Sequence, residues 1–269
     1  MNYKEFSPSE ELNGFVKCYW TLENEAEKIP TRQNIVPDGC MEMIFQIGDL
    51  YKQYISSDEA IVQPRCFVFG QITKPLEIEA TGTSNIFSVR FHPDGFLPFS
   101  SIPLKELENK ANDLTDIFGT KGNQLASDVL SEIDTDSRIK VIESFLLNEL
   151  NEDLVKDKIA KDTVETIFKV NGQTSIEELS QKLNVNRRQI ERKVMQSIGL
   201  SPKQLSKTIR LNNTLKSIIK ADNTTLTEIA LENGYFDQAH FIKDFKELTG
   251  LTPKQFYGEN LKMSISMNK

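Results

Sequence analysis

A chain of 269 residues, of which 38% are hydrophobic and 26% charged, is typical of a soluble protein with about two domains. No apolar run of about 18 residues occurs, which excludes a membrane-spanning helix, and the N-terminal segment lacks the apolar stretch of a signal peptide. We therefore expect a cytoplasmic protein.

The net charge of −7 conceals a difference between the two halves of the chain. Residues 152–269 contain 19 basic and 15 acidic side chains, whereas residues 1–151 contain 13 and 24. Within residues 186–220, nine side chains are basic and one is acidic. A segment of this charge suits contacts with phosphate groups, and a solvated helix face is the alternative interpretation.

The three cysteines, Cys18, Cys40 and Cys66, are odd in number and form no C-x-x-C motif. A disulfide framework or a structural zinc site is therefore not expected. We interpret them as buried free thiols, with a redox sensor as the alternative.

Residues 1–92 are predicted to form strands. Four short segments are rich in β-branched or aromatic residues, are apolar in part at alternate positions, and are separated by Gly and Pro turn residues. They are residues 15–22, 40–47, 66–72 and 85–91. The pattern favours a predominantly antiparallel barrel or sandwich.

Residues 96–151 are predicted to be helical. The apolar residues Ile139, Ile142, Phe145, Leu146 and Leu150 recur at helical spacing, so this face is either core or a dimer seam. The charged segment 151–158 links the two halves and can continue into a helix over residues 159–170. The tail after Tyr257 is expected to be disordered or loosely docked.

A helix pair is predicted from residue 175 onward. Ser175 and Glu178 form an S-x-x-E capping box, which starts the first helix. The second helix begins after Asn186, the expected N-cap, and turns Ile190 and Val194 inward. A short turn between two helices, the second of them exposed, is typical of a helix-turn-helix.

The same pattern returns 51 residues later, where residues 237–256 align with residues 186–205. A second capping box, Thr225 with Glu228, precedes it, and Gly234 ends that helix. A third helix is predicted to start at Thr252-Pro253. A long helix, Pro202–Lys220, joins the repeats; its 19 residues span roughly 28 Å, close to one DNA turn of ~34 Å.

This tandem arrangement resembles the C-terminal DNA-binding domain of AraC/XylS-type transcription regulators. The resemblance covers residues 160–258 and rests above all on LTEIALENGYFDQAHFIKDFKELTGLTPKQF. Five short N-terminal pieces are similar to the N-terminal domain of a poorly characterised AraC-type subgroup: residues 19–20, 37–39, 43–45, 69–70 and 89–93. The expected fold is α+β, with a mainly antiparallel β domain followed by helices, then an all-α domain with two helix-turn-helix units. The expected domains are residues 1–151, for sensing or dimerisation, and residues 159–258, for DNA binding.

The resemblance also implies the residues that would contact DNA. In the first unit, the base-contacting positions fall on Arg188, Glu191 and Arg192, of which Arg suits guanine and Glu suits cytosine. Asn186 and Arg187 lie at the helix start, where phosphate contacts are made. In the second unit the corresponding residues are Gln238, Ala239, Ile242 and Lys243, with His240 at a backbone-contacting position.

Three residues depart from the family's pattern. Phe236 replaces a Ser/Thr cap, so we expect Asp237 to open the helix instead. Ile242 replaces a small polar residue, which suggests that the second half-site is read less stringently. Lys193 stands where an apolar residue is usual, and the sequence offers no reason for it.

No catalytic, cofactor-binding or metal site is expected. The chain has two histidines, His92 and His240, and lacks both a G-x-S-x-G motif and a P-loop. The adaptive alkyl-DNA methyltransferases share this DNA-binding domain, but their four-Cys zinc site cannot be built from three cysteines, and residues 64–67 do not match their nucleophile motif.

The sequence therefore predicts a one-component transcription regulator that binds double-stranded DNA. A small-molecule effector in the N-terminal domain, a homodimer and a contact with RNA polymerase are all compatible with the resemblance. The alternative is a ligand-binding or protein-interaction module with a helical scaffold and no DNA binding. The operator, the effector, and the choice between activation and repression are not encoded in a recognisable way.

Overall fold

The computed structural model describes residues 1–27, 29–220 and 225–259. The chain divides into two compact units, one comprising residues 1–33, 40–71 and 77–156 and the other residues 34–39, 72–76 and 157–269. The predicted tail lies, from residue 260 on, outside the described residues. None of the described helices combines the length and apolar composition needed to cross a bilayer.

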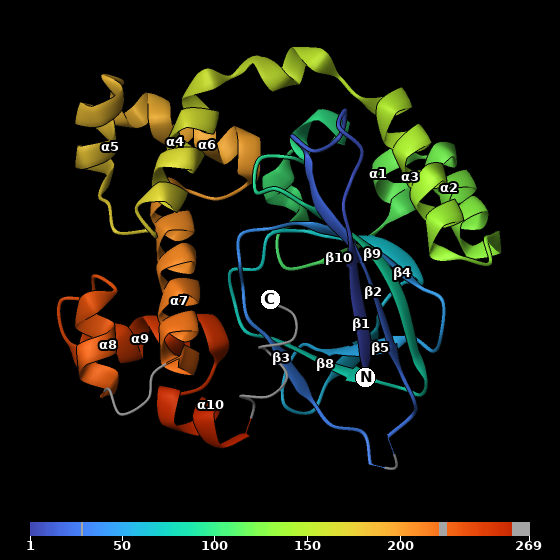
Figure 1. Cartoon of the computed structure of the whole chain (residues 1–269), viewed down its shortest axis with the longest axis horizontal. Helices are drawn as coiled ribbons and strands as arrows, with labels where there is room; N and C mark the ends of the chain where they lie inside the picture. Colours follow the sequence, from blue (N-terminus) through green and yellow to red (C-terminus); the bar gives the residue numbers. More distant parts are fainter. Residues whose placement is uncertain (28, 221–224, 260–269) are drawn as a thin grey trace. The chain divides into compact units, whose positions relative to one another are not determined.

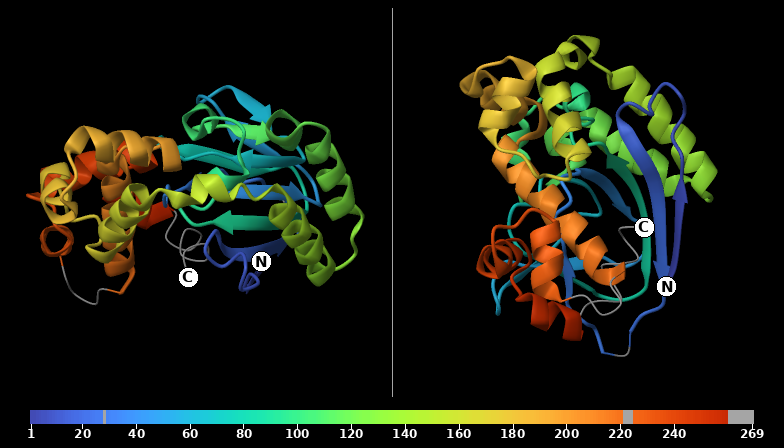
Figure 2. Two further views of the ribbon diagram at one scale, coloured as in Figure 1. Left: turned by 90° about the horizontal axis from the view of Figure 1, so that it is seen from above. Right: turned by 60° about the vertical axis from the view of Figure 1, so that its left-hand side comes forward.

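Ten strands form two sheets in the described part of the N-terminal half (Figures 1 and 2). The larger sheet has the order β1 (Asn2–Phe6), β2 (Val16–Asn24), β9 (Ser84–Phe91), β4 (Glu42–Gln46), β7 (Cys66–Phe69) and β10 (Ala111–Asp113). The smaller sheet has the order β3 (Gln33–Ile35), β8 (Leu76–Ala80), β5 (Tyr51–Tyr54) and β6 (Ala60–Val62). Neighbouring strands such as β2 and β9 pair in antiparallel fashion, and the predicted fold class is confirmed.

Aromatic side chains fill the core on one face of the larger sheet. Tyr19, Phe45 and Phe87 are fully buried, and the Phe87 ring on β9 contacts the rings of Tyr19 and Phe45 on the two flanking strands. Three helices cover this core: α1 (Leu114–Phe118), α2 (Thr120–Ser131) and α3 (Thr135–Glu149). Ile142 and Leu146 of α3 are fully buried in it, so the periodic apolar face of this helix is part of the core. Three short 3₁₀ helices complete the unit: η1 (Leu97–Phe99), η2 (Leu104–Leu107) and η3 (Glu152–Lys156).

The described residues of the second unit from 158 onward form helices joined by short turns (Figure 1). Its helices are α4 (Lys158–Lys169), α5 (Ile176–Leu183), α6 (Arg187–Ile198), α7 (Pro202–Lys220), α8 (Leu226–Glu232), α9 (Gln238–Thr249) and α10 (Pro253–Glu259). The link 151–158 does not continue into α4, because the Asp157 side chain accepts hydrogen bonds from the Ile159 and Ala160 amides and starts a new helix.

Two separate hydrophobic cores lie along α7. At one end, Leu205 and Ile209 pack with α4, α5 and α6 in a core whose buried residues include Val164, Ile167, Leu179, Ile190, Val194, Ile198 and Leu200. At the other end, Leu211 and Leu215 pack with α8, α9 and α10 in a core that includes Ile218, Ile229, Ala230, Tyr235, Phe241, Phe245, Leu248 and Phe256. Figure 1 shows the two helix groups at opposite ends of α7. The predicted linking helix is thus confirmed over its whole length.

The turn after α4 brings the backbone against α7. Gly172 has a φ of +72°, in the left-handed region that side chains rarely adopt. A Cβ atom at this position would lie 2.1 Å from the carbonyl oxygen of Ser206 and 2.7 Å from the backbone nitrogen of Arg210. Both atoms belong to the backbone of α7, so they cannot move aside without displacing the helix.

We expect Gly172→Ala to destabilise the chain by about 2–4 kcal/mol, because it adds left-handed strain to a backbone collision. Urea unfolding followed by circular dichroism measures this. Gly14→Ala is the matched control, since Gly14 has no atom within 4 Å of an added Cβ and should change stability little. Equal stability of the two variants would show that the turn does not abut α7 as described.

Candidate nucleic-acid interface

Local hydrogen bonds set the first helix pair. The Ser175 amide donates to Glu178 Oε2 at 2.7 Å and the Glu178 amide donates to Ser175 Oγ at 3.2 Å, as the capping box predicted. The hydrogen bond from the Ser175 amide, followed by that from the Ser175 side chain, holds the pKa of the Glu178 carboxyl below its usual value. Asn186 caps α6, since its side chain accepts from the Gln189 amide at 2.9 Å. The predicted start of the first recognition helix is confirmed.

The second helix pair repeats this construction. Thr225 and Glu228 form the same reciprocal pair of hydrogen bonds at the start of α8. Gly234, with a φ of +80°, supplies the left-handed turn residue before α9. Asp237 caps α9 by accepting from the His240 amide at 2.7 Å, which confirms that Asp237 opens this helix in place of Phe236.

The first recognition helix, α6, turns its apolar side chains inward and its charged ones outward. Ile190 and Val194 are fully buried, whereas Arg188, Glu191 and Arg192 are exposed. Among the described residues, neither Arg188 nor Arg192 has an ion-pair or hydrogen-bond partner. Their guanidinium groups are therefore free to meet an external acceptor.

Arg187, at the first position of α6, has a partner within the protein. Its guanidinium group forms an ion pair with Glu177 of α5, across the turn between the two helices. A phosphate contact by Arg187 would have to replace this exposed pair, and such replacement is energetically cheap because exposed ion pairs contribute little.

The second recognition helix, α9, presents a different surface. Gln238 and Lys243 are exposed, as an external contact requires. The His240 ring instead turns toward the protein: Nε2 lies 3.6 Å from Asp244 Oδ2, and the ring meets Tyr235 edge-on at 5.2 Å between centroids.

A buried carboxylate ties α9 to α7. Asp244 is 6% exposed and follows Phe241 by three residues, on the inner face of α9. Its Oδ1 lies 3.2 Å from Lys207 Nζ and its Oδ2 lies 3.5 Å from Arg210 Nη2. The Arg210 guanidinium also stands 4.8 Å from the centre of the Tyr235 ring. A carboxylate this deeply buried requires such partners, so the cluster fixes α9 against the linking helix.

Lys193 also has a structural explanation. Its Nζ lies 2.6 Å from Asp157 Oδ2, so it joins the middle of α6 to the N-cap of α4. Burial disfavours the charged form of Asp157, but the Lys193 hydrogen bond and the Ala160 amide outweigh it, and the pKa of this carboxyl is lowered. An apolar residue at position 193 would leave the Asp157 carboxylate without its cation.

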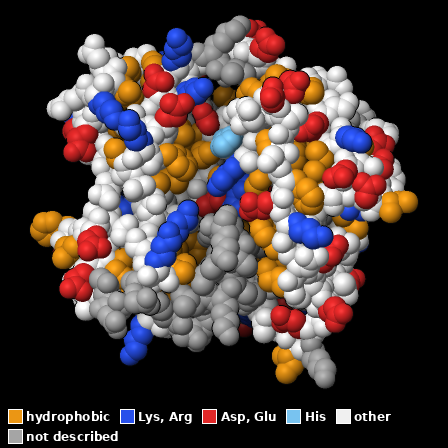
Figure 3. All heavy atoms as spheres, in the orientation of Figure 1, with side chains coloured by type: hydrophobic (Ala, Val, Ile, Leu, Met, Phe, Trp, Pro, Cys, Tyr) orange, Lys and Arg blue, Asp and Glu red, His pale blue; other side chains and the backbone are white. Residues whose placement is uncertain are grey.

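The basic segment 186–220 therefore presents less free charge than its composition suggests. Four of its nine basic side chains form ion pairs within the protein: Arg187, Lys193, Lys207 and Arg210. On the face drawn in Figure 3, Lys and Arg side chains likewise lie interspersed with Asp and Glu. The free positive charge of α6 is thus concentrated at Arg188 and Arg192.

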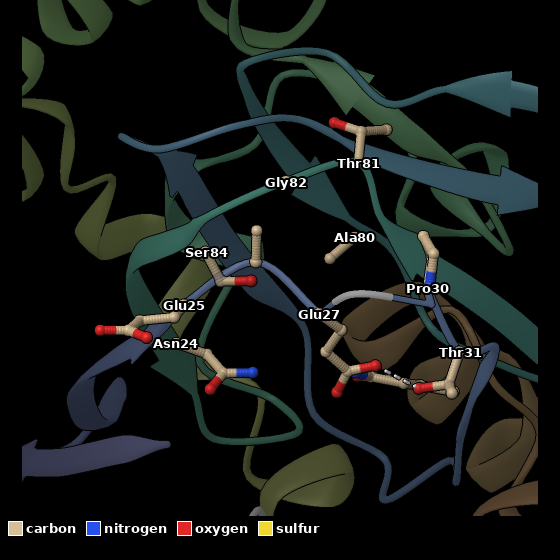
Figure 4. Close-up of a pocket in the computed structure, with 11 residues that line it drawn as sticks. Asn24, Glu25, Glu27, Pro30, Thr31, Ala80, Thr81, Gly82 and Ser84 are labelled. Atoms are coloured by element: carbon tan, nitrogen blue, oxygen red, sulfur yellow. Dashed lines mark hydrogen bonds between the residues drawn. The ribbon is translucent and has the colours of Figure 1, made fainter.

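The N-terminal unit contains a small polar hollow between the β2–β3 connection and the loop after β8 (Figure 4). Its cavity volume is about 60 Å³, and Asn24, Glu27, Thr31 and Ser84 contribute to its lining, with Glu27 accepting a 2.8 Å hydrogen bond from Thr31. Sites for small organic ligands usually measure ~300–1,000 Å³, so this hollow is well below the usual size of such a site.

The cysteines are buried free thiols, as predicted. Burial raises the pKa of Cys18 to about 11 and that of Cys66 to about 12. Because the thiolate is the reactive form, this environment disfavours redox sensing by these two residues. Among the described residues, no group of three or more His, Cys, Asp or Glu side chains is arranged to hold a metal ion.

Two family models match separate parts of the chain. Residues 179–258 match a helix-turn-helix domain, and residues 4–113 match a domain of unknown function. The helix-turn-helix match contains both recognition helices.

Individual relatives are distant. An uncharacterized HTH-type transcriptional regulator of Staphylococcus aureus is 24% identical over an alignment of 202 positions, which covers 65% of this chain and 27% of that protein. One of Haemophilus influenzae is 35% identical over 81 residues, 30% of this chain and 27% of that protein. This chain thus spans about a quarter of the length of these relatives. Among solved structures, ToxT from Vibrio cholerae is 15% identical, with a TM-score of 0.47 over 88% of this chain and 97% of that one.

We expect Lys193→Met to lower the free energy of unfolding by up to about 1 kcal/mol at pH 7, because it removes the partner of Asp157. The folded-state pKa of Asp157 is depressed, so this contribution is present above the unfolded-state pKa of ~3.9 and disappears as the pH falls through the folded-state value. Thermal unfolding of both forms from pH 7 down to pH 3 measures the difference. Lys216→Met, at an exposed position of α7, is the control. If the free energy of unfolding of Lys193→Met stays lower by the same amount at pH 3 as at pH 7, the ion pair is not the cause of the difference.

Proposed function

We propose that this chain, whose C-terminal part is a tandem helix-turn-helix domain of the AraC type, is a one-component transcription regulator that reads two successive major-groove segments of double-stranded DNA. Residues 159–258 are assigned to DNA binding and residues 1–151 to sensing or dimerisation.

One observation carries the proposal: two outward-facing recognition helices, each capped at its N-terminus, are fixed at the two ends of a single helix. Helix α7 has 19 residues, which at ~1.5 Å each span roughly 28 Å. Successive major-groove segments on one face of DNA lie ~34 Å apart. A rigid helix of this length can therefore present α6 and α9 to neighbouring segments.

The exposed side chains of α6 suit base recognition. Arg188 and Arg192 can each donate two hydrogen bonds to guanine O6 and N7, and Glu191 can accept from cytosine N4. Asn186 and Arg187 lie at the helix N-terminus, where backbone amides and a cation suit a phosphate.

On α9, Gln238 and Lys243 are the exposed polar residues assigned to DNA. His240 is assigned a contact with the DNA backbone. Its Nε2 atom can make this contact only by losing its interaction with the Asp244 carboxylate. Lys243 is therefore the stronger candidate for a DNA contact.

The N-terminal unit is the place for an effector or a second copy of the chain. The 60 Å³ hollow is smaller than a usual binding site for an organic effector. RNA polymerase is the further partner expected of a regulator that activates transcription. We assign no enzymatic activity and no cofactor, and the compartment we propose is the cytoplasm.

The competing hypothesis is a ligand-binding or protein-interaction module that does not bind DNA. The two hypotheses differ in salt dependence, because binding to DNA releases counterions from phosphates. We expect the full chain to bind random-sequence duplex DNA with an affinity that falls steeply between about 50 and 200 mM salt, measured by fluorescence anisotropy. A flat salt response, or no binding at the lowest salt, favours the module.

We expect Arg192→Ala to reduce discrimination at one or two base pairs by about 1–3 kcal/mol, because a bidentate contact with guanine is lost. The preferred sequence is first selected from random DNA, and affinities are then measured for each single base change. Arg187→Ala is the matched control: as a phosphate contact, it should weaken binding to all sequences by a similar factor. If Arg192→Ala also weakens all sequences equally, Arg192 contacts a phosphate and not a base.

A further inference from the structure

Helix α9 carries an apolar stripe on the side that faces away from its core. Ile242, Lys243 and Lys246 follow Ala239 by three, four and seven residues, so they share one helix face with it. With Glu247 they line a shallow, open hollow on the surface. Ala239 is exposed, and Ile242 is half-buried, with one side against the core of α8–α10 and the other toward this hollow.

A second apolar group lies at the start of the same helix. Phe236 is 87% exposed and directly precedes the N-cap residue Asp237. Single exposed apolar side chains are common, but the N-terminal end of a recognition helix is where base edges are contacted. An aromatic ring at this point gains nothing from water and can be buried only by an external surface.

The polar groups of α9 that could read bases by hydrogen bonding are few. Gln238, at the first position of the helix, is exposed, but it does not line the hollow. The Asp244 carboxylate and the His240 ring are directed at partners within the protein, and Glu247 Oε2 lies 2.7 Å from Lys207 Nζ. No arginine occurs in α9. What remains on the stripe is an alanine, an isoleucine and two lysines, which is a surface that offers apolar contact flanked by positive charge.

This combination fits one group on DNA. The C5-methyl of thymine is the apolar group that base pairs present in the major groove, and Ala, Thr methyl and Phe are the side chains that contact it. Lys243 and Lys246, at the edges of the stripe, have the charge that complements the phosphates on either side of the groove. By contrast, α6 presents Arg188, Glu191 and Arg192, which read bases by hydrogen bonds.

We propose that α9 recognises thymine methyl groups through Ile242 and Ala239, with Phe236 as a third apolar contact. This inference rests on the proposed function and makes it more specific: the two halves of the DNA site are read by different chemistry. The half bound by α6 is specified by hydrogen bonds to guanine and cytosine, and the half bound by α9 by the positions of thymines.

The test removes the methyl group without changing base pairing. Duplexes selected by the full chain from random DNA are resynthesised with deoxyuridine in place of thymidine, in one half of the site or in the other, and their affinities are measured by anisotropy at fixed salt. We expect deoxyuridine in the half bound by α9 to lower the affinity by about 4-fold for each contacted methyl group, because the transfer free energy of one buried carbon group is lost. Deoxyuridine in the half bound by α6 should have little effect.

Variants assign the effect to α9. Ile242→Ser and Phe236→Ser, which remove the apolar groups, should lose most of the difference between thymidine and deoxyuridine, whereas Ile242→Val should keep it. Arg192→Ala should also keep it, because that residue lies on α6. Since Ile242 contributes partly to the core, Ala239→Ser at an exposed position serves as a second variant that does not depend on core packing.

The outcomes separate the inference from the proposed function. Equal affinity for thymidine and deoxyuridine duplexes in both halves overturns methyl recognition while DNA binding stands. A methyl effect that survives in Ile242→Ser, Phe236→Ser and Ala239→Ser overturns its assignment to α9. Absence of salt-dependent DNA binding by the unmodified chain overturns the proposed function and this inference with it.

Discussion

One helix supplies side chains to two hydrophobic cores, and the arrangement of the second unit depends on it. Leu205 and Ile209 of α7 belong to the core of the first helix-turn-helix, and Leu211 and Leu215 belong to that of the second. Because both sets lie on one continuous helix, the angle and spacing between α6 and α9 follow from helix geometry. The contact at Gly172 and the Asp244 cluster hold the two helix pairs against α7 from either end.

The two recognition helices have the same fold but different surface chemistry. In α6, the inward face carries apolar side chains and one serine, Ser197, but no charged group, and Arg188 and Arg192 remain available outside. In α9, a carboxylate takes part in the inner face, and it draws a histidine and two cations of α7 toward itself. The outer face of α9 is consequently poorer in polar groups. The two helix-turn-helix units therefore share a backbone structure but present different side chains to a ligand.

Sequence reasoning succeeded where the signals were local. Caps, glycine turns and the 51-residue repeat lie within a few residues of the helices they define, and all of these helices were predicted. It failed for short strands such as β5 and β8, the two central strands of the smaller sheet. Strand β8 alternates apolar residues with glutamates and β5 contains Lys52 and Gln53, so neither strand has an apolar run of its own; Lys52 and Glu79 pair across the two strands.

The pairing of charges could not be predicted because it joins residues distant in sequence. Lys193 and Asp157 lie on different helices, and nothing near either residue indicates the other. For Asp244, however, the sequence does indicate an ion pair. This residue lies between Phe241 and Phe245 on the buried face of α9, where an unpaired carboxylate is not tolerated. An acidic residue in an apolar register indicates a cation in the helix packed against it.

The separation of the two cores along α7 also bears on how such a chain can change over generations. A substitution in the core around Phe241 and Phe245 repacks no residue of the core around Ile190 and Val194, because the two sets share no member. Mutations in one half therefore have largely additive effects with respect to the other. The second helix-turn-helix can accumulate replacements such as Phe236 and Ile242, and so drift toward a new binding preference, while the first preserves an ancestral one.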